Sequence, residues 1–224
     1  MPSRVERKIL KTLVLATAIL VTSGIGYADS FSINNTGAGI TPTNPDPNWT
    51  VTTNPTPGST NAFVTDTSGY PFGPWISDTA IYGWDSPQPS YTDGETDSPS
   101  TNYYYSTTFD LTGLDPTSAS LQFQFAVDDA LVAVILNGNT LGGFPAGVLD
   151  TLSVTQTINS DFVSGVNTIT FETFNGPAAS TNPTGLLVDF TSATANSAPE
   201  PSAFLLIGAG LGGLGLIRRR MHSR

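Results

Sequence analysis

The sequence has no cysteine, and its basic residues are confined to the two ends. All eight Lys and Arg residues lie within positions 4–11 and 218–224, and the single histidine is His222. Residues 29–198 therefore contain no Lys, Arg, His or Cys. The absence of cysteine excludes disulfides and thiolate metal sites. The absence of histidine removes imidazole ligands and the commonest general base from this region.

Acidic residues, in contrast, are concentrated between the two ends. Of the 18 Asp and Glu residues, only Glu6 and Glu200 lie outside residues 29–198, so this stretch carries a formal charge of −16. Phosphate backbones and anionic lipid headgroups need cationic partners. The charge balance therefore excludes nucleic-acid binding. The stretch is also long enough to bury a core without disulfides.

The first 28 residues have the three parts of a secretory signal. A basic start is followed by an apolar run from Leu13 to Val21 and by small residues that end at Ala28. The apolar run is about half the ~20 residues that a permanent membrane helix needs. The pattern therefore predicts a signal peptide over 1–28 that is cleaved after Ala28.

The other end has a similar three-part order. A short proline-containing motif precedes an uncharged run over 203–217, and an arginine cluster follows; the residues of the motif and the cluster are Pro199, Glu200, Pro201, Arg218, Arg219 and Arg220. Fifteen helical residues span about 22 Å, less than the ~30 Å hydrocarbon core. We therefore expect a short C-terminal transmembrane helix with the arginines on the cytoplasmic side.

This C-terminal segment, 199–224, resembles the PEP-CTERM sorting signal of exported bacterial proteins. The resemblance implies an exosortase as the processing partner and passage through the inner membrane, where the chain is anchored transiently. It further implies release or attachment at the cell surface or outside the cell, in bacteria that make exopolysaccharide.

The region between the ends has the pattern of an all-β domain. Leu121, Phe123, Phe125 and Val127 alternate with Gln122, Gln124 and Ala126, which predicts a strand with one buried and one wet face. Residues 131–136 are apolar throughout, as in a strand covered on both sides. Asn137 and Gly138 then provide the positive φ angles of a tight hairpin turn.

Further strands are expected over 103–111, 168–174 and 185–190, with an edge strand over 49–53 and a long loop over 70–99. Short strands separated by turn signals favour a two-sheet antiparallel β-sandwich over 29–190. The Ser, Thr and Ala residues of 191–198 indicate a linker to the C-terminal segment.

Residues 72–190 resemble the galactose-binding-like jelly-roll modules of secreted bacterial proteins. The resemblance lies in the order of several short blocks, which are Gly73–Ile76, Tyr105–Leu111, the acidic pair before Ile135–Gly138, Phe162–Asn167 and Pro183–Leu186. It implies a jelly-roll fold, binding to sugars or an adaptor role, and in many cases a structural Ca²⁺.

The long loop holds aromatic residues beside acids, which is the combination that sugar recognition requires. Rings cover the C–H face of a sugar, while carboxylates and amides bind its hydroxyls. The candidate carbohydrate-binding residues are Trp75, Tyr82, Trp84, Asp85 and Tyr91. The alternative is that the tryptophans plug the open end of the sandwich, because large aromatic residues in β-domains are mostly buried.

Two acidic groups are candidate Ca²⁺ ligands. Asp93, Glu95 and Asp97 alternate along one loop, and Asp128 and Asp129 lie where a strand meets a loop. Oxygen ligands of this kind suit Ca²⁺. The alternative is that these acids are simply solvated on a strongly acidic surface.

The composition also limits catalysis. A glycosidase that uses two carboxylates is the only common hydrolase compatible with it. The two glutamates of residues 29–198, Glu95 and Glu172, lie in no recognisable motif. The sequence therefore favours a non-catalytic surface or matrix protein that contacts exopolysaccharide or other matrix proteins. A purely structural coat protein is the second interpretation, and a carboxylate-dependent glycosidase is the third.

Overall fold

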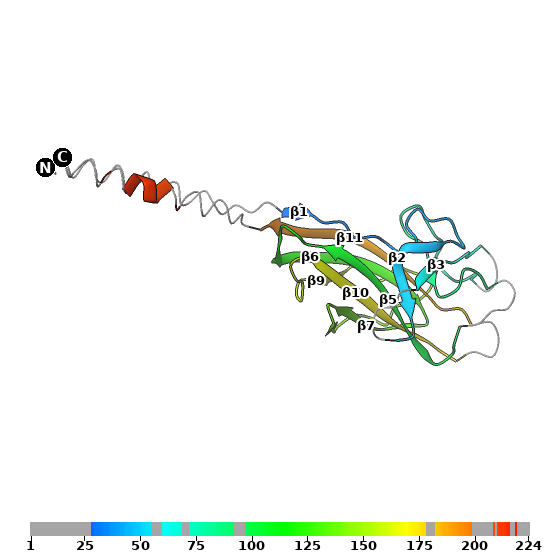
Figure 1. Cartoon of the computed structure of the whole chain (residues 1–224). Coiled ribbons are helices and arrows are strands. Elements are labelled where there is room, and N and C mark those ends of the chain that lie inside the picture. The colour runs from blue at the N-terminus through cyan, green and yellow to red at the C-terminus, as the bar shows by residue number, and fades with distance from the viewer. Residues whose placement is uncertain are drawn as a thin grey trace. The chain divides into compact units, whose positions relative to one another are not determined.

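The computed structural model describes residues 28–54, 60–68, 72–91, 97–177, 182–198, 208, 210–215 and 218 (Figure 1). Residues Asp29–Asn196 form one compact unit. In the C-terminal segment, residues 210–215 are helical. Among the described residues, none of the helices has the length and apolar character needed to cross a membrane. Most of the predicted signal peptide, and Pro199, Glu200, Pro201, Arg219 and Arg220, lie outside the described residues, so those assignments remain predictions.

The compact unit is built from strands, which confirms the all-β prediction. Their bounds are β1 Ala28–Ser30, β2 Pro45–Thr52, β3 Asn61–Val64, β4 Asp85–Ser86, β5 Thr101–Asp110, β6 Leu114–Asp128, β7 Ala130–Leu136, β8 Asn139–Leu141, β9 Gln156–Ile158, β10 Val166–Asn175 and β11 Gly185–Ser197.

The strands form one continuous sheet, whereas the sequence predicted two separate ones. The order is β8-β7-β10-β5-β2-β3-β4-β11-β6-β9, and β1 pairs with β11. Pairings such as β5 with β10 and β7 with β8 are antiparallel. The short strands β3 and β4 link the β5 half to the β6 half, so the two layers of the expected sandwich belong to one curled sheet.

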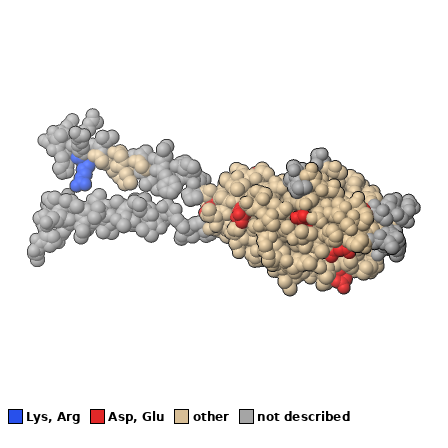
Figure 2. Space-filling view, turned by 90° about the horizontal axis from the view of Figure 1, so that it is seen from below, with Lys and Arg blue, Asp and Glu red and all other residues tan. Residues whose placement is uncertain are grey.

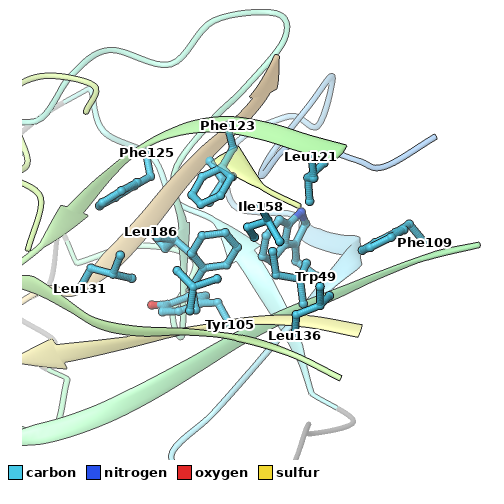
Figure 3. Packing of buried hydrophobic residues seen from close by; sticks show 14 of the residues in the cluster. Trp49, Tyr105, Phe109, Leu121, Phe123, Phe125, Leu131, Leu136, Ile158 and Leu186 are labelled. Atoms are coloured by element: carbon cyan, nitrogen blue, oxygen red, sulfur yellow. The ribbon is translucent and has the colours of Figure 1, made fainter. Parts of the chain in front are cut away.

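The main core lies between the two halves of the curled sheet (Figure 3). Phe123 and Phe125 of β6 point toward Tyr105 and Leu136 of the opposite half, and each of these four side chains is fully buried. The ring of Phe123 meets that of Phe171 edge-on, with centroids 5.4 Å apart. Aromatic packing across the two layers therefore fixes their separation.

Strands β6 and β7 depart in detail from their predicted burial. In β6 the alternation is confirmed, but Ala126, expected on the wet face, is fully buried by a second cluster outside the main core. In β7, Val134 and Leu136 are buried whereas Val132 is 52% exposed. Among the described residues, the strand therefore buries one face and leaves Val132 exposed on the other.

The predicted hairpin turn is confirmed. Asn137 and Gly138 have φ angles of 53° and 83° and connect β7 to β8. The Asn137 side chain also donates to Asn167 Oδ1 at 2.8 Å and accepts from the Thr168 amide at 2.9 Å. The turn is therefore fixed to the start of β10.

Two predictions are wrong, one about the position of β2 in the sheet and one about a linker over 191–198. Strand β2 is not an edge strand, because Thr50 pairs with β3 on one side and with β5 on the other. Residues 191–197 are not a linker but the second half of β11. Ala195 is buried, and the Phe31 amide donates to the Ala193 carbonyl at 3.2 Å. Small alternating residues look like a linker in sequence, yet here they pack on the core.

Candidate functional site

The predicted sugar-binding aromatics form a second buried cluster. Trp75, Trp84 and Tyr91 pack with Phe72 against β6 and β11, on the side opposite the main core. The Trp75 and Trp84 rings lie 4.2 Å apart, and Trp84 is fully buried. Tyr82 is partly buried against the same cluster. The rings are enclosed, so the alternative interpretation, in which the tryptophans plug one part of the sandwich, describes them better.

The polar atoms of these aromatic side chains are bonded within the domain. Trp84 Nε1 donates to the Ile76 carbonyl at 2.8 Å, and Trp75 Nε1 donates to Asp128 Oδ2 at 3.0 Å. The Tyr91 hydroxyl donates to Asp97, and burial beside this carboxylate raises the pKa of Tyr91. Buried Tyr and Trp polar groups need such partners.

Asp85, also predicted to bind sugar, is fully buried in β4. Within the described residues, neither of its carboxylate oxygens has a hydrogen-bond partner. Burial raises its pKa well above the ordinary value, and the charges of Asp46 and Asp78 raise it further. A carboxyl in this position does not reach solvent, so it offers nothing to an external sugar.

Only part of the first predicted Ca²⁺ group is described. Asp93 and Glu95 lie outside the described residues. Asp97 accepts hydrogen bonds from Tyr91, from Gln88 Nε2 at 3.0 Å and from the Thr184 amide at 2.9 Å. These donors occupy both of its oxygens. Burial raises the pKa of Asp97.

The two residues of the second predicted Ca²⁺ group, Asp128 and Asp129, are adjacent in sequence but differ in burial. Asp128 is buried, and burial with the neighbouring Asp129 carboxylate raises its pKa to about 7. Asp129 is exposed and accepts a hydrogen bond from the Gly176 amide. In the part of the chain that the structure describes, no group of three or more Asp, Glu, His or Cys side chains is arranged to hold a metal ion.

A different surface has the chemistry that sugar binding requires. On β5, Tyr103, Tyr105 and Phe109 point into the core, so the alternate residues point outward. We call the outward side of β2, β5, β10 and β7 the outer face. It carries Thr50, Thr52, Asn102, Tyr104, Ser106, Thr108, Ala133, Ile135, Thr168, Thr170, Glu172 and Phe174, and most of these side chains are polar.

The register of the strands aligns these side chains in rows across the outer face. Thr52, Tyr104, Glu172 and Ala133 are direct neighbours on successive strands. Neighbouring strands lie ~4.8 Å apart, so one row presents a ring, a carboxylate and a hydroxyl within the length of a few sugar units.

Tyr104 and Glu172 are joined directly. The Tyr104 hydroxyl donates to Glu172 Oε1 at 2.9 Å, and Asn102 Nδ2 donates to the same oxygen at 2.6 Å. Partial burial raises the pKa of Tyr104, and the Glu172 carboxylate adds to this rise. All three side chains are partly exposed. Together they provide a ring face, a carboxylate and an amide in one place, held rigid by hydrogen bonds.

Sequence reasoning did not find this site. The alternation of Asn102, Tyr104 and Thr108 with buried aromatic residues was visible as a signal for an exposed face. The partner of Tyr104, however, is 68 positions away. Only the pairing of β5 with β10 brings Glu172 beside it.

Comparisons with known proteins give little further guidance. No protein-family model matches the chain. No curated protein matches it either. Among solved structures, it is similar to a family 35 carbohydrate binding module from an environmental isolate, with a TM-score of 0.22 and 16% sequence identity. The similarity covers 46% of this chain and 76% of that chain. A likeness this distant carries no information about ligands.

Proposed function

We propose that this chain is a non-catalytic exported protein that binds polysaccharide through the outer face of its β-domain. The protein would be displayed at the cell surface or in the extracellular matrix. Its finer sandwich architecture would be that of a jelly roll, in which one sheet surface is free for contacts.

The ends of the chain support export. The signal-like segment 1–28 and the sorting-like segment 199–224 lie on either side of the acidic domain. In this proposal the first directs the chain across the inner membrane. The second holds the chain there, with Arg218, Arg219 and Arg220 inside, until an exosortase processes it.

One observation above all supports polysaccharide binding. Tyr104 presents a partly exposed ring beside the Glu172 carboxylate and the Asn102 amide. Such a ring can cover the C–H face of a sugar, while the carboxylate and the amide bind its hydroxyls. The surrounding threonines provide further hydroxyl groups on the same face.

The composition of the domain supports a role without catalysis. Residues 29–198 contain no His, Lys, Arg or Cys. Glu172 is the single glutamate in the described part of the domain, and its Oε1 is already engaged by Asn102 and Tyr104. A carboxylate fixed in this way suits recognition better than proton transfer.

Binding to a panel of neutral, acidic and amine-bearing polysaccharides tests the proposal. The full chain would be purified in a non-ionic detergent that has no sugar headgroup. We expect binding to at least one polysaccharide, and a Tyr104→Ala variant that binds on the order of tenfold more weakly. Tyr82→Ala is the matched control, because Tyr82 is also partly buried but packs against the second cluster rather than on the outer face.

Other outcomes would change the assignment. Loss of binding with Tyr82→Ala but not with Tyr104→Ala would move the site to the loop cluster. Binding to none of the polysaccharides would favour the purely structural coat protein. Glycan hydrolysis that is lost with Glu172→Gln would instead indicate an enzyme. For the export half, the intact mass of protein recovered from the cell surface should lack residues 1–28.

A further inference from the structure

The charge of the domain restricts which polysaccharide it can attract. Between residues 29 and 198 it has 16 acidic side chains and no basic one. Figure 2 shows acidic groups scattered over the domain, with no basic group among its described residues. Polymers with carboxylates, sulfates or phosphates would be repelled by this surface, whereas a cationic polymer would be attracted. Charge complementarity therefore favours a cationic glycan.

The Tyr104–Glu172 pair on the outer face has the groups that bind an ammonium ion. An ammonium is attracted to the face of an aromatic ring, and it forms charge-assisted hydrogen bonds with a carboxylate. Tyr104 and Glu172 provide both groups side by side, with 2.9 Å between the hydroxyl and Oε1. Within the described part of the chain, the hydrogen bonds from Asn102 and Tyr104 both end on Oε1. The second oxygen, Oε2, is therefore available for a ligand.

We propose that the outer face binds a polysaccharide that carries free amines, such as a polymer of glucosamine. This inference rests on the proposed function. The ammonium group of one sugar lies against the Tyr104 ring and the Glu172 carboxylate. Free amines are the common cationic groups of polysaccharides, so they match a domain that has no positive charge of its own.

The neighbouring rows of the outer face suit the rest of such a chain. Thr108 is exposed and lies beside Thr168 on the next strand. Ser106 and Thr170 hydrogen-bond to each other at 2.7 Å and are almost fully buried, so they fill the middle of the face without projecting from it. An extended sugar chain can therefore lie flat across β5 and β10, with its hydroxyls against the threonines.

Two oligosaccharides of equal length test this inference, one of glucosamine and one of N-acetylglucosamine, because they differ only in the free amine. Binding is measured with the full chain at mildly acidic pH, where the amines are protonated. We expect the glucosamine oligomer to bind about tenfold more tightly than the acetylated one. Glu172→Gln should remove most of this preference. Asp150→Asn, which removes the same charge from an exposed loop, should leave it intact.

The failures of the two proposals can be distinguished. Equal binding of both oligomers overturns the amine inference and leaves the proposed function standing. If neither oligomer binds but another polysaccharide of the panel does, the amine inference alone is again overturned. If Glu172→Gln and Asp150→Asn weaken binding equally, the attraction is diffuse and no amine site exists at Tyr104. Tyr104→Phe, which keeps the ring, should retain the preference, and its loss would contradict the contact with the ring face.

Discussion

Trp75 donates a hydrogen bond from its indole nitrogen to Oδ2 of Asp128 over 3.0 Å, and both side chains are buried. The sequence placed the first residue in a sugar site and the second in a Ca²⁺ site. Their bond instead makes them part of one internal network, which continues through the contact of the Trp75 ring with the tilted Trp84 ring. Aromatic and acidic residues that look functional in sequence thus hold the long loop against β6.

Replacing Trp75 by phenylalanine tests this internal role. Trp75→Phe keeps an aromatic ring but removes the donor to Asp128, which leaves a buried carboxyl without that partner. We expect the free energy of unfolding to fall by about 1–3 kcal/mol. Urea unfolding followed by circular dichroism would measure the change. Weaker polysaccharide binding at unchanged stability would instead return Trp75 to a sugar site.

Two glycines allow the stability cost of backbone strain to be measured apart from that of close packing. Gly37 and Gly39 have φ angles of 60° and 68°, and a Cβ on Gly37 would lie 2.8 Å from the Gly83 Cα, whereas a Cβ on Gly39 meets nothing within 4 Å. Gly39→Ala should therefore cost only about 1 kcal/mol of stability, for the left-handed backbone. Gly37→Ala should cost about 1–3 kcal/mol more, because the Gly83 backbone must move.

Thermal unfolding of both glycine variants checks this difference. Gly39→Ala serves as the control, because it carries the same backbone cost without the contact. Equal losses of stability in the two variants would mean that the loop around Gly83 moves at little cost in free energy. In that case the hydrogen bond from Thr36 Oγ1 to the Gly83 carbonyl, 2.7 Å long, would not fix the approach.

Local pattern was enough to predict the central strands but not how the sheet closes. Alternation identified β6, and the Asn137–Gly138 dipeptide identified the hairpin, because both depend on neighbouring residues only. The two-residue strand β4 has no such signal. It forms because Asp85 pairs with Val64 on one side and with Leu186 on the other. These contacts come from distant parts of the chain and are not encoded in local periodicity.

The same limit explains why the candidate site on the outer face could not be predicted from the sequence. The sequence pattern placed rings and carboxylates in one loop, but it could not tell which rings are covered. Trp84 is enclosed because it packs with the apolar Ala126 and Leu187 on the outer side of β6 and β11. Tyr104, on the outer face, remains partly exposed. The covering of one surface rather than another is a property of the tertiary fold.

Asp97 provides a test of the predicted Ca²⁺ site. Its carboxylate accepts from the Tyr91 hydroxyl, the Gln88 amide and the Thr184 backbone amide. Asn cannot accept all three, so Asp97→Asn should lower the free energy of unfolding by about 1–3 kcal/mol. We expect the same loss in Ca²⁺ and in a chelator, measured by thermal unfolding. A Ca²⁺-dependent rise in the midpoint of the natural chain, absent in the variant, would instead make Asp97 a metal ligand.

Several buried carboxyls should make the domain more stable in acid than at neutral pH. The pKa values of Asp78 and Asp97 are raised by burial, and that of Asp128 is raised to about 7. A carboxyl with a higher pKa in the folded chain binds its proton more tightly when folded. Its contribution is complete below the unfolded pKa of about 3.9 and is lost as pH rises through the folded pKa. Unfolding free energies from about pH 4 to about pH 7 should therefore decrease.

Asp85 should account for a distinct part of that decrease, because it is fully buried and its carboxylate has no hydrogen-bond partner among the described residues. Residues 29–198 also contain no basic side chain to neutralise it. While it stays protonated in the fold, each pH unit above about 4 costs up to about 1.4 kcal/mol, because the unfolded chain releases the proton. Asp85→Asn is neutral at every pH, so its stability should fall less steeply and the gap to the natural chain should narrow as pH rises. Asp150→Asn removes a charge from an exposed loop and should leave the slope unchanged. An unaltered slope in Asp85→Asn would mean that Asp85 is ionised in the folded protein, with a cation bound beside it.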